Sequence, residues 1–170
     1  MINTNRPRRS VLYMPGANTR ALEKAKSLSA DSLILDLEDA VAPDAKAVAR
    51  ENIYAALESG FGHREAVVRI NGLNTQWGID DLKFFAKSKA DAILLPKVES
   101  AAQIQEAAKL LEQINPTHKL TIWAMIETPM AIFKLPEICS SHPLLETLVL
   151  GTSDLVKDLH ARHTPGRVES

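Results

Sequence analysis

Short apolar runs alternate with helical stretches along the 170-residue sequence, and this alternation constrains the fold more than any other feature. The apolar runs predict β-strands at residues 10–14, 32–37, 66–70, 92–95, 121–126 and 147–150. Helical spacing and capping residues predict helices at residues 19–30, 44–59, 78–87, 100–113 and 130–139, the last broken near its middle by Pro136. Strands that alternate with helices pair in parallel through right-handed crossovers. The sequence therefore predicts an α/β fold with a parallel sheet.

Two architectures fit this order of elements, an open doubly wound sheet and a (β/α)8 barrel. Polar or charged residues follow most of the predicted strands: Asp36, Glu38 and Asp39; Arg69 and Asn71; Lys97 and Glu99; Glu127; and Asp154. In a barrel these residues converge on one face, whereas an open sheet would spread them along an edge. Neither a G-x-G-x-x-G fingerprint nor a G-x-S-x-G elbow is present. We therefore expect a (β/α)8 TIM barrel of which this chain covers about six β/α units, since a whole barrel takes about 250 residues.

Carboxylates at two of these strand ends indicate a hard metal ion. Glu127 follows the run at 121–126, and Asp154 follows the run at 147–150. No Cys or His accompanies them, and Mg²⁺ is usually held by one or two carboxylates together with water and substrate oxygens. Arg69 adds a planar, permanently charged group suited to a carboxylate or a developing enolate. This set points to carbon–carbon bond making or breaking beside the carbonyl of an α-keto or α-hydroxy acid.

Composition narrows the partners and the compartment. Lys and Arg total 20 against 21 Asp and Glu, a net charge of −1, which offers no basic field for nucleic acid or for an anionic membrane. No apolar run approaches the roughly 18 residues of a membrane span. The lone Cys139 can form no internal disulfide, which suggests a reducing, cytoplasmic setting, and we expect it to pack as a small buried residue.

A set of motifs occurs in order along the chain: RRSVLYMPG at 8–16, LILDLEDAVAPDAK at 33–46, VRIN at 68–71, LPKVE at 95–99, MIETP at 125–129 and LGTSDL at 150–155. Together they resemble the citrate lyase β-subunit-like group of the HpcH/HpaI aldolase superfamily, which includes malyl-CoA and methylmalyl-CoA lyases. The resemblance covers residues 8–160. The DLEDAVAP block is its most specific part.

The resemblance implies a (β/α)8 barrel that binds Mg²⁺. It also implies cleavage or formation of a 3-hydroxyacyl-CoA, of the malyl-CoA or citramalyl-CoA type, by retro-Claisen or Claisen chemistry through an enolate. By motif match, Glu127 and Asp154 would be the metal ligands. Arg69 and Glu127 would be the catalytic residues and would contact the substrate.

Further positions follow from the same resemblance. Tyr13 and Lys24 match positions that lie near CoA in the group. Asp36, Glu38 and Asp39 match a charged block at the floor of the site. We expect Glu38 and Asp39 to orient the catalytic arginine or metal-bound water. The expected partners are a CoA thioester and a small keto or hydroxy acid.

Members of this group continue past the last motif with further strand–helix units. We therefore expect one domain over residues 1–170 that is shortened at its carboxyl end. Its first and last strands would be unpaired edges, with exposed apolar positions at Val11, Leu12 and Val149 or on their flanking helices. In the full-length form we expect a homo-oligomer, a trimer or hexamer. Two alternatives stay open, an aldolase that acts on free 2-keto acids without CoA and an inactive truncated product.

Overall fold

A parallel, curled sheet forms the centre of the computed structural model, which describes residues 6–117, 120–164 and 166. Its strands lie in chain order: β1 (Val11–Pro15), β2 (Ser32–Asp36), β3 (Glu65–Arg69), β4 (Ala92–Leu95), β5 (Thr121–Ile126) and β6 (Leu145–Leu150). All neighbouring strands pair in parallel. The predicted parallel α/β fold is confirmed, and each predicted strand is present with its ends shifted by at most 2 residues.

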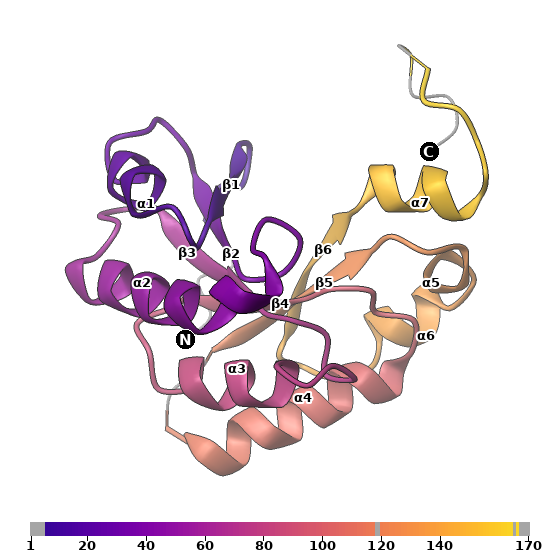
Figure 1. Ribbon diagram of the computed structural model, residues 1–170. Coiled ribbons are helices and arrows are strands. Elements are labelled where there is room, and N and C mark those ends of the chain that lie inside the picture. Colours follow the sequence, from indigo (N-terminus) through magenta and orange to yellow (C-terminus); the bar gives the residue numbers. More distant parts are fainter. Residues whose placement is uncertain (1–5, 118–119, 165, 167–170) are drawn as a thin grey trace.

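Helices cover the convex side of the sheet (Figure 1). They are α1 (Thr19–Ala25), α2 (Lys46–Ser59) after a 3-10 turn at Pro43–Ala45, α3 (Gly78–Phe85), α4 (Ala101–Ile114), α5 (Pro129–Phe133) and α6 (Leu135–Cys139). A further helix, α7 (Thr152–Asp158), lies beyond the carboxyl end of β6. The first helix ends earlier than predicted. The N–H groups of Lys26, Ser27 and Leu28 each bond to the carbonyl three residues back, so the chain tightens into a 3-10 turn after Ala25.

The predicted helix over 130–139 is two short helices, α5 and α6. The break falls at Lys134, which ends α5 and caps α6, and not at Pro136. Pro136 lies in the first turn of α6, where a missing backbone N–H costs no hydrogen bond. The prediction that Cys139 is buried is wrong, because this last residue of α6 is exposed.

The sequence predicts no helix after residues 147–150, but the structure has α7 there, which includes Leu155. Leu155 and Val156 bury their side chains and hold this helix against the carboxyl end of the sheet. Asp154 thereby lies in the first turn of a helix. No helix in the described part of the chain is both long and apolar enough to cross a membrane.

Side chains alternate between the two faces of the sheet and form two apolar cores. The larger core lies between the sheet and the helices and includes Leu33, Leu35 and Val68. The smaller core lies on the concave face and consists of Ile34, Val67, Ala92, Leu94, Trp123 and Met125, with Val11 and Val149 packed against it. The concave face is therefore a filled interior, as in a barrel, rather than an open surface.

Ion pairs close the amino end of this interior. Arg8 donates two hydrogen bonds of 2.7 Å to Glu65, which is 2% exposed and also accepts the Ser32 hydroxyl. The same guanidinium lies 5.2 Å from the centre of the Trp123 ring and 3.1 Å from Glu146. Polar groups therefore lie at both ends of the interior, and apolar side chains fill its middle.

β1 and β6 are the two edges of the sheet, as predicted. Of the strand positions expected to be exposed, Leu12 is exposed, whereas Val11 and Val149 are half-buried. The exposed apolar positions of β6 are instead Leu148 (37%) and Leu150 (51%). Val149 packs onto the concave core, so its neighbours on the strand point to the convex face.

Candidate active site

Two adjoining pockets lie at the carboxyl end of the sheet and share the side chains of Glu127 and Asp154. The larger, of about 550 Å³, is lined by the loops after β3, β4 and β5 and by α7. The smaller, of about 340 Å³, opens over the concave face and is lined by Tyr13, Asp39 and Arg69 among others. The predicted convergence of strand ends therefore occurs, with the two carboxylates between the pockets.

Arg69 is buried at the carboxyl end of β3 and is paired to the neighbouring strand. Asp36 lies beside it in the sheet register, so the two side chains leave the sheet on the same face. Nε and Nη2 of Arg69 each donate a 2.7 Å hydrogen bond to Asp36. Burial alone would raise the pKa of the Asp36 carboxyl, but the hydrogen bonds and charge of Arg69 outweigh burial and hold this pKa below its usual value.

Asp36 occupies only one edge of the Arg69 guanidinium, and the end that carries Nη1 lies near two other acids. Nη1 lies 3.1 Å from Oε2 of Glu38 and 3.5 Å from Asp39, and the guanidinium lies 5.0 Å from the centre of the Tyr13 ring. Because Asp36 occupies the edge formed by Nε and Nη2, a substrate oxygen would approach from the Nη1 end. Asp36, with two hydrogen bonds, is the main partner that orients Arg69. Glu38 and Asp39, which were predicted to orient it, each make one contact with Nη1.

The loop after β2 is held by hydrogen bonds from both sides. The carboxylate of Asp36 accepts the backbone N–H groups of Glu38 and Ala40. Nζ of the buried Lys46 donates to the carbonyls of Leu37 and Glu38, each at 2.7 Å. Burial raises the pKa of Glu38 despite the nearby Arg69, and Oε2 of Glu38 has no well-aligned hydrogen bond within the described residues. The loop therefore presents to the site a half-buried carboxylate that pairs with Arg69 without a well-aligned hydrogen bond to Oε2.

Glu127 is as deeply buried as Asp36, each at 1% exposed. Its Oε1 accepts the backbone N–H of Lys97 at 2.8 Å. Burial raises the pKa of Glu127 to about 7, and the negative charges of Glu38 and Asp154 add to the increase. Glu127 therefore lies near the negative charges of Glu38 and Asp154. A bound cation would reduce the repulsion among these carboxylates.

The carboxylates fit a magnesium ion better than a softer metal. Glu127 and Asp154 are side by side, and both reach the two pockets. Within residues 6–117, 120–164 and 166, no group of three or more His, Cys, Asp or Glu side chains is placed to hold a metal ion. A metal at this position would therefore take two protein carboxylates and complete its shell with water and substrate oxygens, as Mg²⁺ commonly does.

The sequence agrees with a known protein family over nearly its whole length. The model of the family described as HpcH/HpaI aldolase/citrate lyase matches residues 9–170. The chain belongs to this family.

Two curated relatives of this chain are named for their action on CoA esters. The (3S)-malyl-CoA thioesterase of Cereibacter sphaeroides is 47% identical over 169 residues, which make up 99% of this chain and 57% of that protein. The L-malyl-CoA/beta-methylmalyl-CoA lyase of the same species is 37% identical over 167 residues, 94% of this chain and 52% of that protein. The chain thus spans about half the length of these curated relatives.

A solved structure from the family shows the same fold. Protein CitE from Mycobacterium tuberculosis, in complex with magnesium, acetoacetate and coenzyme A, superposes with a TM-score of 0.73 at 29% identity. The match covers 92% of this chain and 54% of that one. The curled six-stranded sheet is therefore TIM-barrel-like in the manner of this relative.

The two residues expected near CoA, Tyr13 and Lys24, lie in different places. Tyr13 is 42% exposed, and its ring covers Arg69 beside the smaller pocket. Burial of the phenol raises the pKa of Tyr13. Lys24 is exposed on α1 and lines neither of the pockets that contain Glu127. The geometry therefore brings Tyr13 to the site and leaves Lys24 outside it.

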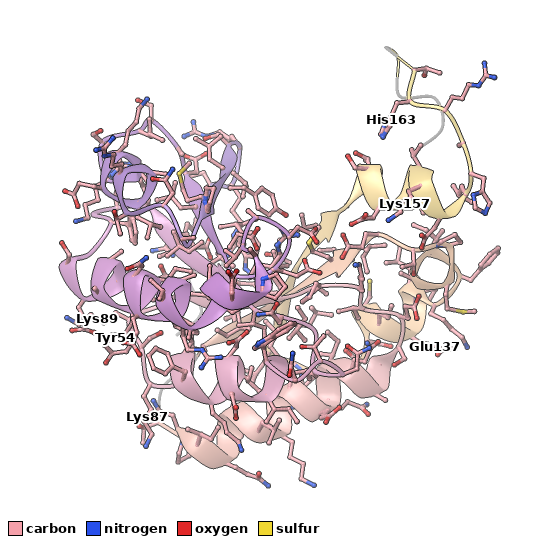
Figure 2. All side chains as sticks on the ribbon, in the orientation of Figure 1. Tyr54, Lys87, Lys89, Glu137, Lys157 and His163 are labelled. Atoms are coloured by element: carbon pink, nitrogen blue, oxygen red, sulfur yellow. The ribbon has the colours of Figure 1, made fainter. Side chains whose placement is uncertain are left out.

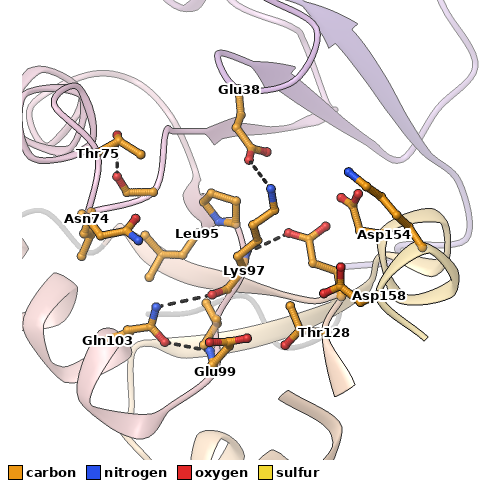
Figure 3. Close-up of a pocket in the computed structure, with 16 residues that line it drawn as sticks. Glu38, Asn74, Thr75, Leu95, Lys97, Glu99, Gln103, Thr128, Asp154 and Asp158 are labelled. Carbon is orange, nitrogen blue, oxygen red and sulfur yellow. Dashed lines mark hydrogen bonds and ion pairs between the residues drawn. The ribbon is translucent and has the colours of Figure 1, made fainter. Parts of the chain in front are cut away.

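The larger pocket includes residues that the sequence reading did not select. Asn74 and Thr75 come from the loop after β3, Gln103 from α4, and Lys157 and Asp158 from α7 (Figures 2 and 3). The turn residues Asn71-Gly72 were a visible signal for the loop after β3. No comparable signal marked α7, because its two buried residues follow a polar stretch.

Glu127 is expected to make protein stability depend on pH. In the folded protein its pKa is raised from 4.5 to about 7, so between these values the folded state binds more protons than the unfolded state. The contribution of Glu127 is therefore fully present below pH 4.5 and is lost as the pH rises to about 7. Urea unfolding of the metal-free chain, compared with Glu127→Gln at each pH, measures it. A wild-type-minus-variant difference that stays flat over this range would contradict the prediction.

Gly151 is expected to be required for space beside Glu127. A Cβ on Gly151 would lie 2.5 Å from Cβ and 2.6 Å from Oε2 of Glu127, so Gly151→Ala must displace the carboxylate. We expect a stability loss of about 1–3 kcal/mol from overpacking, together with weaker Mn²⁺ binding by isothermal titration. Gly60→Ala is the control for Mn²⁺ affinity: the positive φ of Gly60 (84°) makes this substitution costly for stability too, but its Cβ would meet nothing within 4 Å and so leaves Glu127 in place. Equal Mn²⁺ affinity of Gly151→Ala and the wild type would show that Glu127 tolerates the crowding.

Proposed function

We propose that the chain carries the metal and substrate site of a Mg²⁺-dependent carbon–carbon lyase that acts on a 3-hydroxyacyl-CoA of the malyl-CoA type. The observation that carries this proposal is the meeting of Glu127, Asp154 and Arg69 at one end of the sheet. The bound magnesium, acetoacetate and coenzyme A of the M. tuberculosis relative support it. By the same likeness, we infer that the sheet is the first six units of a (β/α)8 barrel that forms one domain.

The residues of the site suit charge development on a carbonyl oxygen. When bound, Mg²⁺ would polarise the oxygens of an α-keto or α-hydroxy acid. Glu127 and Asp154 would hold it. Arg69 lines the smaller pocket, and its guanidinium would supply a permanent positive charge to an oxygen that becomes negative as the carbon–carbon bond breaks. Asp36 keeps the guanidinium from turning, so this donor is oriented before the substrate arrives.

Thioester hydrolysis is the second candidate. The 47% identity to a (3S)-malyl-CoA thioesterase, against 37% to a malyl-CoA lyase, favours it. Both reactions would begin with the same bound thioester. They differ in the bond that breaks: the carbon–carbon bond in a lyase and the carbon–sulfur bond, by addition of water, in a thioesterase.

Product analysis after incubation with malyl-CoA and Mg²⁺ distinguishes the candidates. Acetyl-CoA with glyoxylate supports the lyase, whereas malate with free CoA supports the thioesterase. Calorimetric titration with Mg²⁺, then with a keto acid and with acetyl-CoA, tests the binding steps separately. Keto-acid binding without any CoA binding would favour an aldolase for free 2-keto acids. Binding of neither ligand in the presence of Mg²⁺ would refute the proposed site.

A further inference from the structure

Lys97 has an unusual backbone conformation at the edge of the site. Its φ is +48°, and within the described ranges only one other non-glycine residue, His160 at +52°, has a positive φ. An L-residue with a side chain rarely adopts this left-handed conformation, which costs free energy unless its surroundings hold it there. Such residues often cluster at functional sites, so the contacts that this conformation creates at Lys97 are informative.

The left-handed conformation directs main-chain N–H groups at β5 and the residue after it. The N–H of Lys97 donates to Oε1 of Glu127 at 2.8 Å, and the N–H of the next residue, Val98, donates to the carbonyl of Met125 at 3.2 Å. A hydrogen bond to a carboxylate is stronger than one between neutral groups. The turn after β4 therefore fixes the position of one oxygen of Glu127.

The start of α4 holds the same turn from the other side. Oε1 of Gln103 accepts the backbone N–H groups of Glu99 and Ser100 in a capping box, and its Nε2 donates to the Lys97 carbonyl at 3.4 Å (Figure 3). Both peptide groups of Lys97 thus have partners. Four consecutive N–H donors, from Lys97 to Ser100, and the Lys97 carbonyl define the turn, which leaves the Lys97 backbone little freedom.

We propose that Lys97 is a positioning residue whose left-handed backbone orients Glu127. Its N–H holds Oε1, while Oε2 remains beside Gly151, at the start of the helix that carries Asp154. One oxygen is thereby committed to the backbone of Lys97, and the rest of the carboxylate lies beside Asp154, the other proposed metal ligand. This inference rests on the proposed role of Glu127 in holding the metal.

The side chain of Lys97 has a separate and weaker contact. Its Nζ lies 3.7 Å from Glu38, and the side chain is 55% exposed (Figure 3). Exposed ion pairs contribute little. The inference therefore assigns the function of this position to the peptide N–H, not to the ammonium group, and the two can be separated by mutation.

Two substitutions separate the backbone from the side chain. Lys97→Gly removes the ammonium group but adopts a positive φ readily. Lys97→Val also removes the ammonium group, and its β-branched side chain disfavours this conformation strongly, so the N–H should turn away from Glu127. His160→Val introduces the same strain at an exposed residue that lines neither pocket containing Glu127, and serves as the control.

Mn²⁺ affinity and crystal structures of the metal-free variants test the inference. We expect Lys97→Val to bind Mn²⁺ roughly tenfold more weakly or worse, the scale of one hydrogen bond to a charged group. Lys97→Gly and His160→Val should stay within about twofold of the wild type, since neither loses that bond. Wild-type affinity in Lys97→Val, or equal losses in the valine and glycine variants, would overturn the inference.

The crystal structures keep this test independent of the metal proposal. In Lys97→Val the Glu127 carboxylate should leave its wild-type position, and in Lys97→Gly it should stay. If the wild-type chain binds no Mn²⁺, the metal proposal fails, and the two structures still decide the positioning role. An unmoved Glu127 in Lys97→Val would refute that role whatever the affinities are.

Discussion

Replacing Arg69 with lysine is expected to slow turnover of a malyl-CoA-type thioester by roughly 10²–10³-fold, the effect of losing one oriented donor to a developing oxyanion. Lysine keeps the positive charge but not the planar geometry. It cannot donate in parallel to both oxygens of Asp36 while presenting a further nitrogen to the pocket, as Arg69 does. The measurement is kcat and KM for malyl-CoA at saturating Mg²⁺.

Keto-acid affinity of the same variant shows where the effect arises. If Arg69 acts mainly as the charge is forming, kcat falls more than the keto-acid affinity does. Arg64→Lys is a matched control, because Arg64 donates to the carbonyl groups of Leu28 and Phe61 and lines neither pocket that contains Glu127. Near wild-type turnover of Arg69→Lys would show that Arg69 only supports the structure.

Removing Asp36 should have the largest effect on stability. Asp36→Ala deletes the acceptor of two Arg69 hydrogen bonds and of the N–H groups of Glu38 and Ala40. It also leaves Arg69, whose side chain is 7% exposed, without its main counter-charge. Breaking a buried pair from one side typically costs about 3–5 kcal/mol. Because domains are stable by only about 5–15 kcal/mol, urea unfolding should show a much lower midpoint.

A double variant distinguishes the loss of a partner from the loss of the ion pair itself. Asp36→Leu with Arg69→Met replaces both charges by apolar groups, which is often neutral or stabilising relative to a buried pair. We expect the double variant to be more stable than Asp36→Ala. A double variant that is less stable than Asp36→Ala would mean that the Asp36–Arg69 ion pair itself stabilises this end of the sheet. The cost of leaving one charge without its partner would then not explain the loss.

The positions of the strands and of the main charged residues follow directly from the sequence. Apolar runs such as 121–126 fit a buried strand and little else, and the strand at Thr121–Ile126 has the predicted bounds. Parallel strands bring their carboxyl ends to the same edge, so Glu127 and Asp154 had to lie near each other. The prediction needed only the order of the elements, and no side-chain geometry.

Other features depend on details that a single sequence does not encode locally. The pairing of Arg69 with Asp36 follows from the register of β2 against β3, which aligns these two residues. The left-handed backbone of Lys97 has no sequence signal, because lysine is not a residue typical of that conformation. Gly151 looked like an ordinary turn glycine, and its role in giving space to Glu127 appears only when both are placed in three dimensions.

The order of the strands in the sheet is the same as their order along the chain, from β1 to β6. Each strand after β1 therefore pairs with the strand that precedes it in the chain, which has already been synthesised. Each pairing closes a single crossover between strands that are consecutive in the chain, which costs less entropy than a pairing between strands far apart in sequence. Folding can then advance from the amino end during synthesis, with β6 and α7 added last. Asp154 would thus join Glu127 only at the final step, so the capacity to bind a metal would arise when the rest of the described fold is already assembled.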